Sequence, residues 1–225
     1  MEFSDLICPI RLGCEGCKVE EDVFSRSEFK RDFDRIIFLP AFRRLQGKTQ
    51  VFPFPANDHI HNRLTHSLEV YSIGRSLGTL AANLIDPENC KSKTPPEIYG
   101  DIVGAAALAH DIGNTPFGHS GEDAFMRFFQ GEGKKLIASF NKQQKFDFSR
   151  FEGNAIGFRM LTNSKPLLKA NEGGLGLTYS TLAAFIKYPT RSYLAGDKSK
   201  VSEKKHSFCE SEEKFVERVF SFFNI

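Results

Sequence analysis

The chain has 225 residues, 40% of them hydrophobic and 26% charged, a composition typical of a soluble globular protein with a sizeable core. Its 30 basic and 28 acidic residues give a formal net charge of +2, which provides no reason to expect attraction of the whole protein to nucleic acid or membrane. Without a targeting pattern at the start, or an apolar run approaching the ~20 residues that span a bilayer, the expected location is the cytoplasm and no membrane partner is expected.

The first segment of the chain carries three of the five cysteines. An odd number of cysteines without a secretion signal predicts free thiols rather than disulfides. Cys14 and Cys17 have the spacing of one half of a zinc knuckle, and Cys8 could add a third thiolate. Because Cys90 and Cys209 are isolated and form no second pair, we expect free cysteines here rather than structural zinc.

Helical patterns dominate the middle of the chain. Between Asn62 and Ile85 the apolar residues recur at steps of three and four and predict one long amphipathic helix (Leu64, Leu68, Ile73, Leu77, Leu80, Leu84). A second helix is expected to begin at Thr94, with Glu97 completing a capping box, and to end near Gly113. Its alanines predict close approach to a neighbouring helix.

The remaining elements are also helical, so the predicted fold class is all-α. A capping box at Ser120 predicts a short helix that Gly131 ends, and a further helix is expected over residues 154–161. Thr178 is expected to cap a helix that Pro189 ends. The polar, lysine-rich residues 192–207 predict an exposed loop, and residues 210–225 an amphipathic helix. Its abrupt end fits either a chain cut within a domain or a terminal helix docked on its own core.

The chemically richest stretch is AALAHDIGNTPFGHSGED, residues 106–123. His110 and Asp111 end a predicted helix, and a neutral imidazole with a carboxylate suits Mn²⁺, Fe²⁺, Co²⁺, Ni²⁺ or Zn²⁺, or Mg²⁺ with added water. A His-Asp pair alone more often marks a solvated helix end. His66 on the preceding helix would supply a third ligand, and Arg63, one turn before it, would need a bridging anion such as phosphate.

His119 and Glu122 lie three residues apart on the next predicted helix. At that spacing the carboxylate can orient the imidazole and raise its basicity for proton transfer. The alternative is a solvated histidine and a glutamate that compensates the helix dipole.

Together these segments resemble a known family. HNRLTHSLEV from His61, AHDIGNTPFGHSGE, FEGNAIGFRML from Phe151 and the upstream run RDFDRIIFLPAFRRLQGKTQVF are similar to the deoxyguanosine triphosphate triphosphohydrolase family of the HD-domain superfamily, in the family's order. The resemblance covers residues 31 to about 189. It implies an HD-domain helical bundle, with an amino-terminal extension over 1–30, a partial catalytic core over 31–190, and an exposed loop and helix over 191–225.

The resemblance also implies roles for particular residues. His66, His110 and Asp111 would bind the divalent metal, most simply Mn²⁺ or Mg²⁺, and His119 with Glu122 would form the catalytic pair. The family hydrolyses a deoxynucleoside triphosphate to the deoxynucleoside and tripolyphosphate. The residues that would contact the substrate are Arg63 at the polyphosphate, Gln50 at the sugar, and Arg44, Lys48, Lys187 and Tyr188 in the nucleotide pocket.

One departure from the family pattern bears on activity. The family's fourth metal ligand is a later aspartate, and after Asp123 this chain has only Asp147 and Asp197. We therefore expect an amino-terminal fragment with weakened metal binding and doubtful turnover alone. The alternatives are an HD phosphohydrolase acting on another nucleotide, or a non-catalytic nucleotide-binding or oligomerisation subunit that uses an exposed face over residues 215–223. The resemblance further implies a homo-oligomer and single-stranded nucleic acid as a candidate effector.

Overall fold

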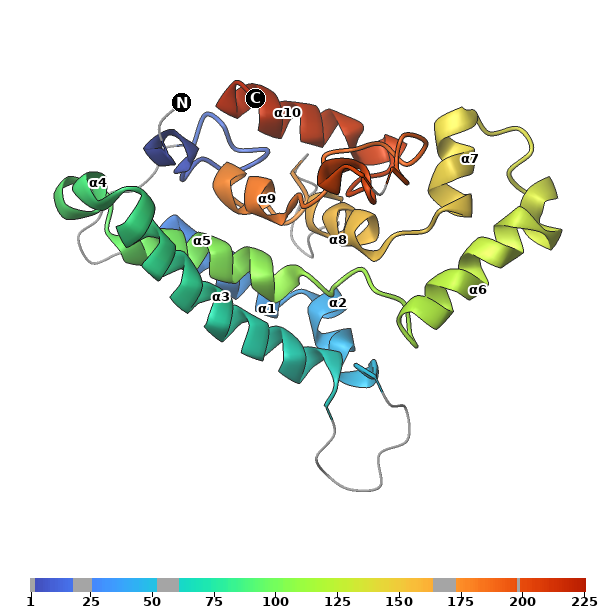
Figure 1. Ribbon diagram of the computed structural model, residues 1–225, viewed down its shortest axis with the longest axis horizontal. Coiled ribbons are helices and arrows are strands. Elements are labelled where there is room, and N and C mark those ends of the chain that lie inside the picture. Colours follow the sequence, from blue (N-terminus) through green and yellow to red (C-terminus); the bar gives the residue numbers. More distant parts are fainter. Residues whose placement is uncertain (1–2, 18–25, 52–60, 164–172, 198) are drawn as a thin grey trace.

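The computed structural model describes residues 3–17, 26–51, 61–163, 173–197 and 199–225, and within them the fold is all-α, as predicted (Figure 1). The only β-type pairings in these residues are isolated bridges. The helices, with η for 3₁₀ turns, are η1 (Phe3–Leu6), α1 (Glu28–Ile37), α2 (Pro40–Arg43), η2 (Arg44–Gly47), α3 (Arg63–Ile85), α4 (Pro87–Ser92), α5 (Pro96–Ala109), α6 (His119–Gln130), η3 (Glu132–Lys135), α7 (Lys142–Ser149), α8 (Gly153–Thr162), α9 (Tyr179–Phe185), η4 (Val201–Glu203), η5 (Glu210–Glu212) and α10 (Glu213–Phe223).

Helix α5 is the centre of the bundle. It packs against α3, α1 and α9, and α10 in turn packs on α9. Nine of its 14 residues are buried, which explains why its sequence is mostly apolar or small. The core around it also takes in Leu12 from the first segment and Phe215 and Val219 from α10. One hydrophobic core thus draws on residues from both ends of the described chain.

Helices α3 and α5 approach each other through glycines, in line with the predicted close approach. A Cβ atom at Gly78 would lie 3.0 Å from the carbonyl oxygen of Tyr99, and one at Gly100 would lie 2.7 Å from the carbonyl oxygen of Arg75. There is no room for larger side chains at this contact. The face of α3 that carries small residues therefore packs against α5. This contact keeps the start of α3, with His66, near the end of α5, with His110.

This packing corrects the interpretation of the apolar stripe on α3. The helix itself is confirmed, and Asn62 caps it by accepting a hydrogen bond from the backbone N–H of Thr65. Its buried residues, however, include Ser67, Gly78 and Ala82, whereas the apolar stripe faces outward. Of the stripe, Leu64 is half-buried against the core, and the exposed members are Leu68, Ile73, Leu77, Leu80 and Leu84. The glycine contact with α5 selects the small face, although the other is more hydrophobic.

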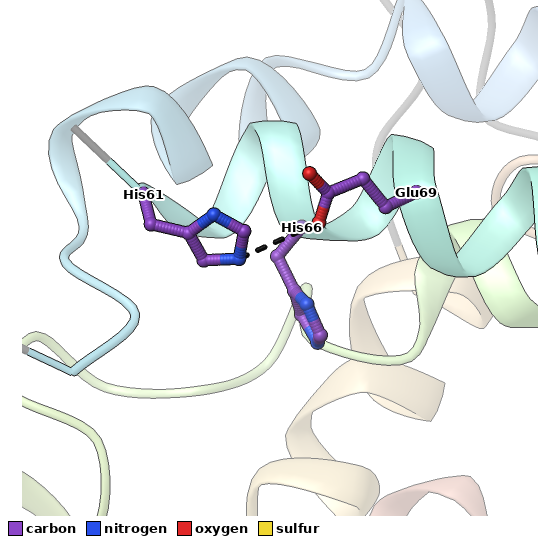
Figure 2. Close-up of side chains that lie close together, drawn as sticks. All are labelled: His61, His66 and Glu69. Atoms are coloured by element: carbon purple, nitrogen blue, oxygen red, sulfur yellow. Dashed lines mark ion pairs between the residues drawn. The ribbon is translucent and has the colours of Figure 1, made fainter. Parts of the chain in front are cut away.

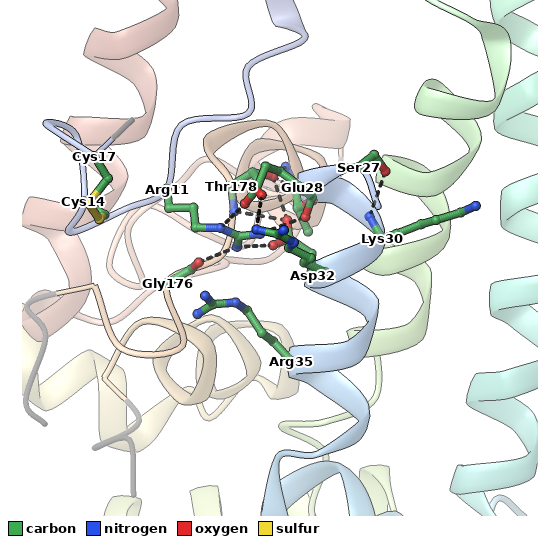
Figure 3. A network of polar contacts seen from close by, with 12 residues as sticks. Arg11, Cys14, Cys17, Ser27, Glu28, Lys30, Asp32, Arg35, Gly176 and Thr178 are labelled. Atoms are coloured by element: carbon green, nitrogen blue, oxygen red, sulfur yellow. Dashed lines mark hydrogen bonds and ion pairs between the residues drawn. A yellow bond between two sulfur atoms is a disulfide. The ribbon is translucent and has the colours of Figure 1, made fainter. Parts of the chain in front are cut away.

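A buried polar network ties the first segment to α1 and α9 (Figure 3). The guanidinium of Arg11 donates to the carboxylate of Asp32 at 2.6 Å, and also to Glu28 and the carbonyl oxygen of Gly176. The second oxygen of Asp32 accepts from the hydroxyl and backbone N–H of Thr178, at 2.7 and 3.0 Å. Thr178 caps α9 as predicted. Every charge in this network has a partner, which is the condition for burying it.

The cysteine prediction is wrong for one pair. Cys14 and Cys17 form a disulfide across a turn, with their Cα atoms 5.3 Å apart, while Cys8, Cys90 and Cys209 are free. The turn, closed by a hydrogen bond from the N–H of Cys17 to the carbonyl of Cys14, brings the two residues within bonding range.

Two predicted helix starts also differ from the structure. Helix α5 begins after Pro95, and α6 begins after Gly118, and neither has a side-chain cap. The capping boxes predicted at Thr94 and Ser120 therefore do not form. Helix α5 ends at Ala109, and residues 110–113 form turns rather than the last turn of the helix.

The last segment is more buried than its sequence predicts. Asp197 and Lys200 are exposed, as expected for the loop, but Ser192, His206 and Ser207 are buried. The apolar face of α10 is likewise buried in the core rather than exposed (Phe215, Val216, Val219, Phe223). No helix in the described part of the chain has both the length and the apolarity needed to cross a bilayer.

Candidate active site

The structure brings His66, His110 and Asp111 together. His66 lies in the first turns of α3, and the other two directly follow the last turn of α5. One ligand atom from each lies within 4.8 Å of the other two, and His110 Nε2 is 3.3 Å from Asp111 Oδ1. Donor atoms that bind the same ion at about 2.1 Å lie roughly 3.0–3.4 Å apart. These three residues, here called the inner triad, can therefore hold a divalent cation.

The ring of His110 is set for metal binding by its own helix. Its Nδ1 lies 2.7 Å from the carbonyl oxygen of Ala107, so Nδ1 carries the proton and Nε2 presents its lone pair. The edge of this ring meets the ring of His66, with centroids 5.2 Å apart. Burial, and then the neighbouring His110, lowers the pKa of His66 below its usual value. Both effects favour the neutral imidazole that a metal requires.

Asp111 is buried and held by two partners. Arg63 Nη1 donates to Oδ2 at 2.7 Å, and the Asn114 side chain donates to Oδ1 at 2.5 Å. Arg63 is itself buried, and its Nε has no hydrogen-bond partner in the described structure. A guanidinium with an unused donor beside a possible cation site fits an anionic ligand that bridges the two.

A cavity of about 460 Å³ opens beside the triad. His119 and Glu122 lie in its wall, and His119 Nδ1 is 2.7 Å from Glu122 Oε2. Glu122 is buried while the His119 ring is largely exposed, so the carboxylate fixes the ring and Nε2 remains available. The residues lining the cavity are Gln50, Val51, Arg63, His110, Asp111, Asn114, Phe117, Gly118, His119, Glu122, Glu152, Asn154 and Lys205.

Comparison with known proteins agrees with this geometry. Residues 63–160, which hold the triad and the His119–Glu122 pair, match the HD domain family. The chain is 47% identical over 197 residues to a deoxyguanosinetriphosphate triphosphohydrolase-like protein of Synechocystis, covering 86% of this chain and 44% of that protein. The chain belongs to the deoxyguanosinetriphosphate triphosphohydrolase-like family of HD-domain proteins.

Two further relatives within the family show the same coverage. A triphosphohydrolase-like protein of Listeria monocytogenes is 40% identical, over 96% of this chain and 48% of that protein. A deoxyguanosinetriphosphate triphosphohydrolase of Salmonella arizonae is 32% identical, over 91% of this chain and 45% of that protein. The chain thus spans about half the length of the curated relatives it matches.

The segment before α3 reaches the site through backbone pairing. The N–H of Arg63 donates to the carbonyl of Lys48, and the N–H of Gln50 donates to that of His61. This pairing places Gln50 in the cavity wall, where its buried Oε1 has no partner in the described residues. Lys48 Nζ donates to the carbonyl of Asn114 at 2.6 Å. Burial, and then nearby Arg63, lowers the pKa of Lys48.

Besides Lys48, three predicted substrate-binding residues lie outside the cavity wall. Arg44 is exposed on η2, close enough to Lys48 to influence its charge. Tyr188 is buried, and its backbone N–H donates to Ser207. Lys187 is exposed and lies over the Tyr188 ring, 5.4 Å from its centroid. The structure therefore does not bring Lys187 or Tyr188 into the cavity.

Four polar side chains of the cavity wall were missed by the sequence analysis. Asn114 and Asn154 lie inside the two family-like strings, so their position in those motifs was a usable signal. Glu152 lies in the same string and pairs with Lys205 at 3.0 Å. Lys205 belongs to the predicted loop, and no local pattern in the sequence indicates that it folds back onto the site.

Asp147 and Asp197, the two aspartates that follow Asp123 in the sequence, do not join the inner triad. The carboxylate of Asp147 accepts a hydrogen bond from the backbone N–H of Glu210, and the exposed Asp197 accepts from Ser199. Among the described residues, Asp147 and Asp197 belong to neither group that could hold a metal ion. The described chain therefore offers three of the four ligands that the family resemblance implies.

Proposed function

We propose that this chain carries the metal-binding and phosphate-binding part of a deoxynucleoside triphosphate triphosphohydrolase. The observation that supports this most directly is that His110 and Asp111, which group with His66 in the inner triad, line one cavity together with Arg63 and the His119–Glu122 pair. The reaction consumes one water, breaks the bond between the α-phosphorus and the 5′ oxygen, and yields the deoxynucleoside and tripolyphosphate.

The inner triad suits a divalent metal, for which Mn²⁺ or Mg²⁺ is the first expectation and Fe²⁺, Co²⁺, Ni²⁺ or Zn²⁺ the alternatives. When bound, such an ion polarises a phosphoryl oxygen and makes a bound water more acidic. Asp111 would serve it through Oδ1 while Oδ2 holds Arg63 in place. His110 would bind through Nε2, because Nδ1 is engaged with its own helix.

Arg63 is the residue proposed to bind the polyphosphate. Its Nη1 is committed to Asp111, which leaves Nε and Nη2 to face an anion. Gly118 permits this arrangement, since a Cβ atom there would lie only 2.8 Å from Nη2. Phosphate oxygens that bridge a guanidinium and a cation are stabilised by both charges.

His119 is the residue proposed to move the proton. Glu122 accepts a hydrogen bond from Nδ1 of His119. The other nitrogen, Nε2, can therefore exchange a proton with the attacking water or with the leaving 5′ oxygen. Gln50 lies in the same wall and is the proposed contact for the sugar. The base preference, an oligomeric assembly and a response to single-stranded nucleic acid are further predictions of the resemblance.

The competing functions differ in what they would release. An HD phosphohydrolase acting on another nucleotide would use the same triad and release a different phosphate product. A non-catalytic subunit would bind metal or nucleotide without turnover. The structure gives this alternative less support, because the apolar side chains of its proposed interaction face, residues 215–223, are buried in the core.

The deciding experiment is an assay of tripolyphosphate release from each deoxynucleoside triphosphate with Mn²⁺ or Mg²⁺. His119→Ala should lower turnover by about 10²–10⁴-fold and leave Mn²⁺ affinity unchanged. Asn83→Ala, an exposed change on α3 away from the site, is the matched control. Metal binding without turnover in the unaltered chain would favour the non-catalytic alternative. Release of another product would favour the alternative substrate.

A further inference from the structure

A second group of metal-binding side chains lies on the outer side of the inner triad. His61, His66 and Glu69 each offer one ligand atom within 4.8 Å of the other two (Figure 2). His61 Nε2 lies 3.4 Å from Glu69 Oε2, and the rings of His61 and His66 have centroids 5.9 Å apart. This outer triad shares His66 with the inner one, and both consist of two histidines and one carboxylate.

The backbone around the start of α3 holds the outer triad in place. The carbonyl of His61 accepts from the N–H of Gln50, and the next residue, Asn62, caps the helix. His66 and Glu69 are three residues apart on α3 and therefore project from the same face. The Asn62 cap fixes the position of His61 next to the first turn of α3. The local backbone therefore brings the three side chains together.

The side-chain spacing matches a metal site. The distance of 3.4 Å between His61 Nε2 and Glu69 Oε2 lies in the range of roughly 3.0–3.4 Å expected for two donors on one ion. His61 is the only ion-pair partner of Glu69 in the described residues. Both side chains are more than half exposed, so an ion can reach them directly from solvent.

We propose that His61, His66 and Glu69 form a second divalent-cation site that competes with the inner triad for His66. A neutral imidazole has one lone pair, so His66 binds one ion at a time unless it loses its remaining proton. An ion held outside removes one of the three inner ligands. Excess metal therefore weakens the inner site by occupying the outer one.

The ligand chemistry selects the ion. Two imidazoles and one carboxylate suit borderline first-row cations such as Zn²⁺ and Co²⁺. Mg²⁺ prefers oxygen ligands and retains its waters, so it is expected to leave the outer triad empty when no phosphate anion is present to add oxygen ligands. This difference gives the proposal a chemical control.

The first test measures Co²⁺ binding by calorimetry in a background where the inner triad is damaged. His110→Ala should still bind Co²⁺ through the outer triad. Adding His61→Ala should weaken this binding by at least about tenfold, because loss of a residue that only supports a metal ligand already has an effect of that size. Adding Asn83→Ala instead should change nothing. Equal affinities for the His110→Ala single variant and the His61→Ala/His110→Ala double variant would overturn the proposal.

A second test keeps the inner triad intact, so it does not depend on whether His110→Ala folds. The exposed His61 of the unaltered chain is modified with diethyl pyrocarbonate and the modification is quantified by mass spectrometry. Zn²⁺ should protect His61, Mg²⁺ should not, and Glu69→Gln should remove the protection. Absence of Zn²⁺ protection, or protection that persists in Glu69→Gln, contradicts the outer site. Because the signal is read at His61, it is independent of whether the inner triad supports hydrolysis.

Discussion

The Nδ1 atom of His110 lies 2.7 Å from the carbonyl oxygen of Ala107, three residues earlier on α5. This oxygen, in the last turn of the helix, also accepts from the backbone N–H of His110 at 3.3 Å. The bond from Nδ1 turns Nε2 towards Asp111. The end of α5 thus orients the ring of a candidate metal ligand.

Asp111→Asn should weaken metal binding without unfolding the chain. An amide keeps the size of the side chain but loses the negative charge, so Mn²⁺ affinity should fall at least about tenfold. Mn²⁺ at about 100 times its dissociation constant should add about 2.7 kcal/mol to the unfolding free energy of the unaltered chain. Thermal unfolding with Mn²⁺ and with EDTA measures this gain. Asp197→Asn is the control, and an undiminished gain in Asp111→Asn would exclude Asp111 as a ligand.

Arg63→Lys should weaken binding of inorganic tripolyphosphate in the presence of Mn²⁺. A lysine can pair with Asp111 or face the cavity, but it lacks the forked donors that do both. The loss of one charge-assisted hydrogen bond of about 1.5–3 kcal/mol corresponds to roughly 10- to 100-fold in affinity. Calorimetric titration measures it, with Arg127→Lys, an exposed change outside the cavity wall, as the control. Equal affinities would place the phosphate elsewhere.

Two aspartates on α1 should differ sharply in their contribution to stability. Asp32→Ala leaves the mostly buried guanidinium of Arg11 without its nearest buried charge partner and should cost about 3–5 kcal/mol. Asp34→Ala breaks a pair with Arg26 that is much more exposed and should cost less than about 1 kcal/mol. Urea denaturation of both variants measures the difference. Similar costs would mean that the Arg11 network does not hold the first segment to α1 and α9.

The outward stripe of α3 and the buried core of α5 make another matched comparison. Leu77→Ala, on the outward stripe, should cost less than about 1 kcal/mol, since the side chain is 59% exposed. Leu108→Ala, fully buried on α5, should cost about 2–5 kcal/mol by removing contacts and leaving a cavity. A large cost at Leu77 in urea denaturation would show that the stripe is covered in solution.

The sequence predicts the helices of the site well because their signals are local. The Thr178 cap and the Gly131 end each depend on residues within one or two turns, and both are found in the structure, as is the helix predicted between Asn62 and Ile85. The grouping of His66 with His110 and Asp111 rests on their ligand chemistry and on the family resemblance, since no local pattern shows that α3 and α5 are neighbours.

What the sequence does not predict depends on contacts between distant segments. The α3 stripe points outward because the glycine contact with α5 takes the opposite face, and this competition is not visible in the periodicity of α3 alone. Lys205 is part of a polar stretch that predicts a solvated loop, yet it pairs with Glu152 at the cavity. A polar residue that pairs with a distant partner leaves no local signature.

His206 should make stability depend on pH in the mildly acidic range. Burial lowers its pKa to about 4, and its Nε2 has no hydrogen-bond partner in the described structure. Above pH 6.5 the ring is neutral in both the folded and the unfolded states, so it adds no pH dependence there. Between pH 6.5 and about 4, His206 binds a proton in the unfolded chain but not in the folded chain. The free energy of unfolding should therefore fall by up to about 1.4 kcal/mol per pH unit on acidification, roughly 3 kcal/mol in all. Urea denaturation across this range measures the slope, which His206→Gln should flatten and His61→Gln, at an exposed histidine, should leave unchanged. An identical slope in His206→Gln would assign the acid sensitivity to other groups.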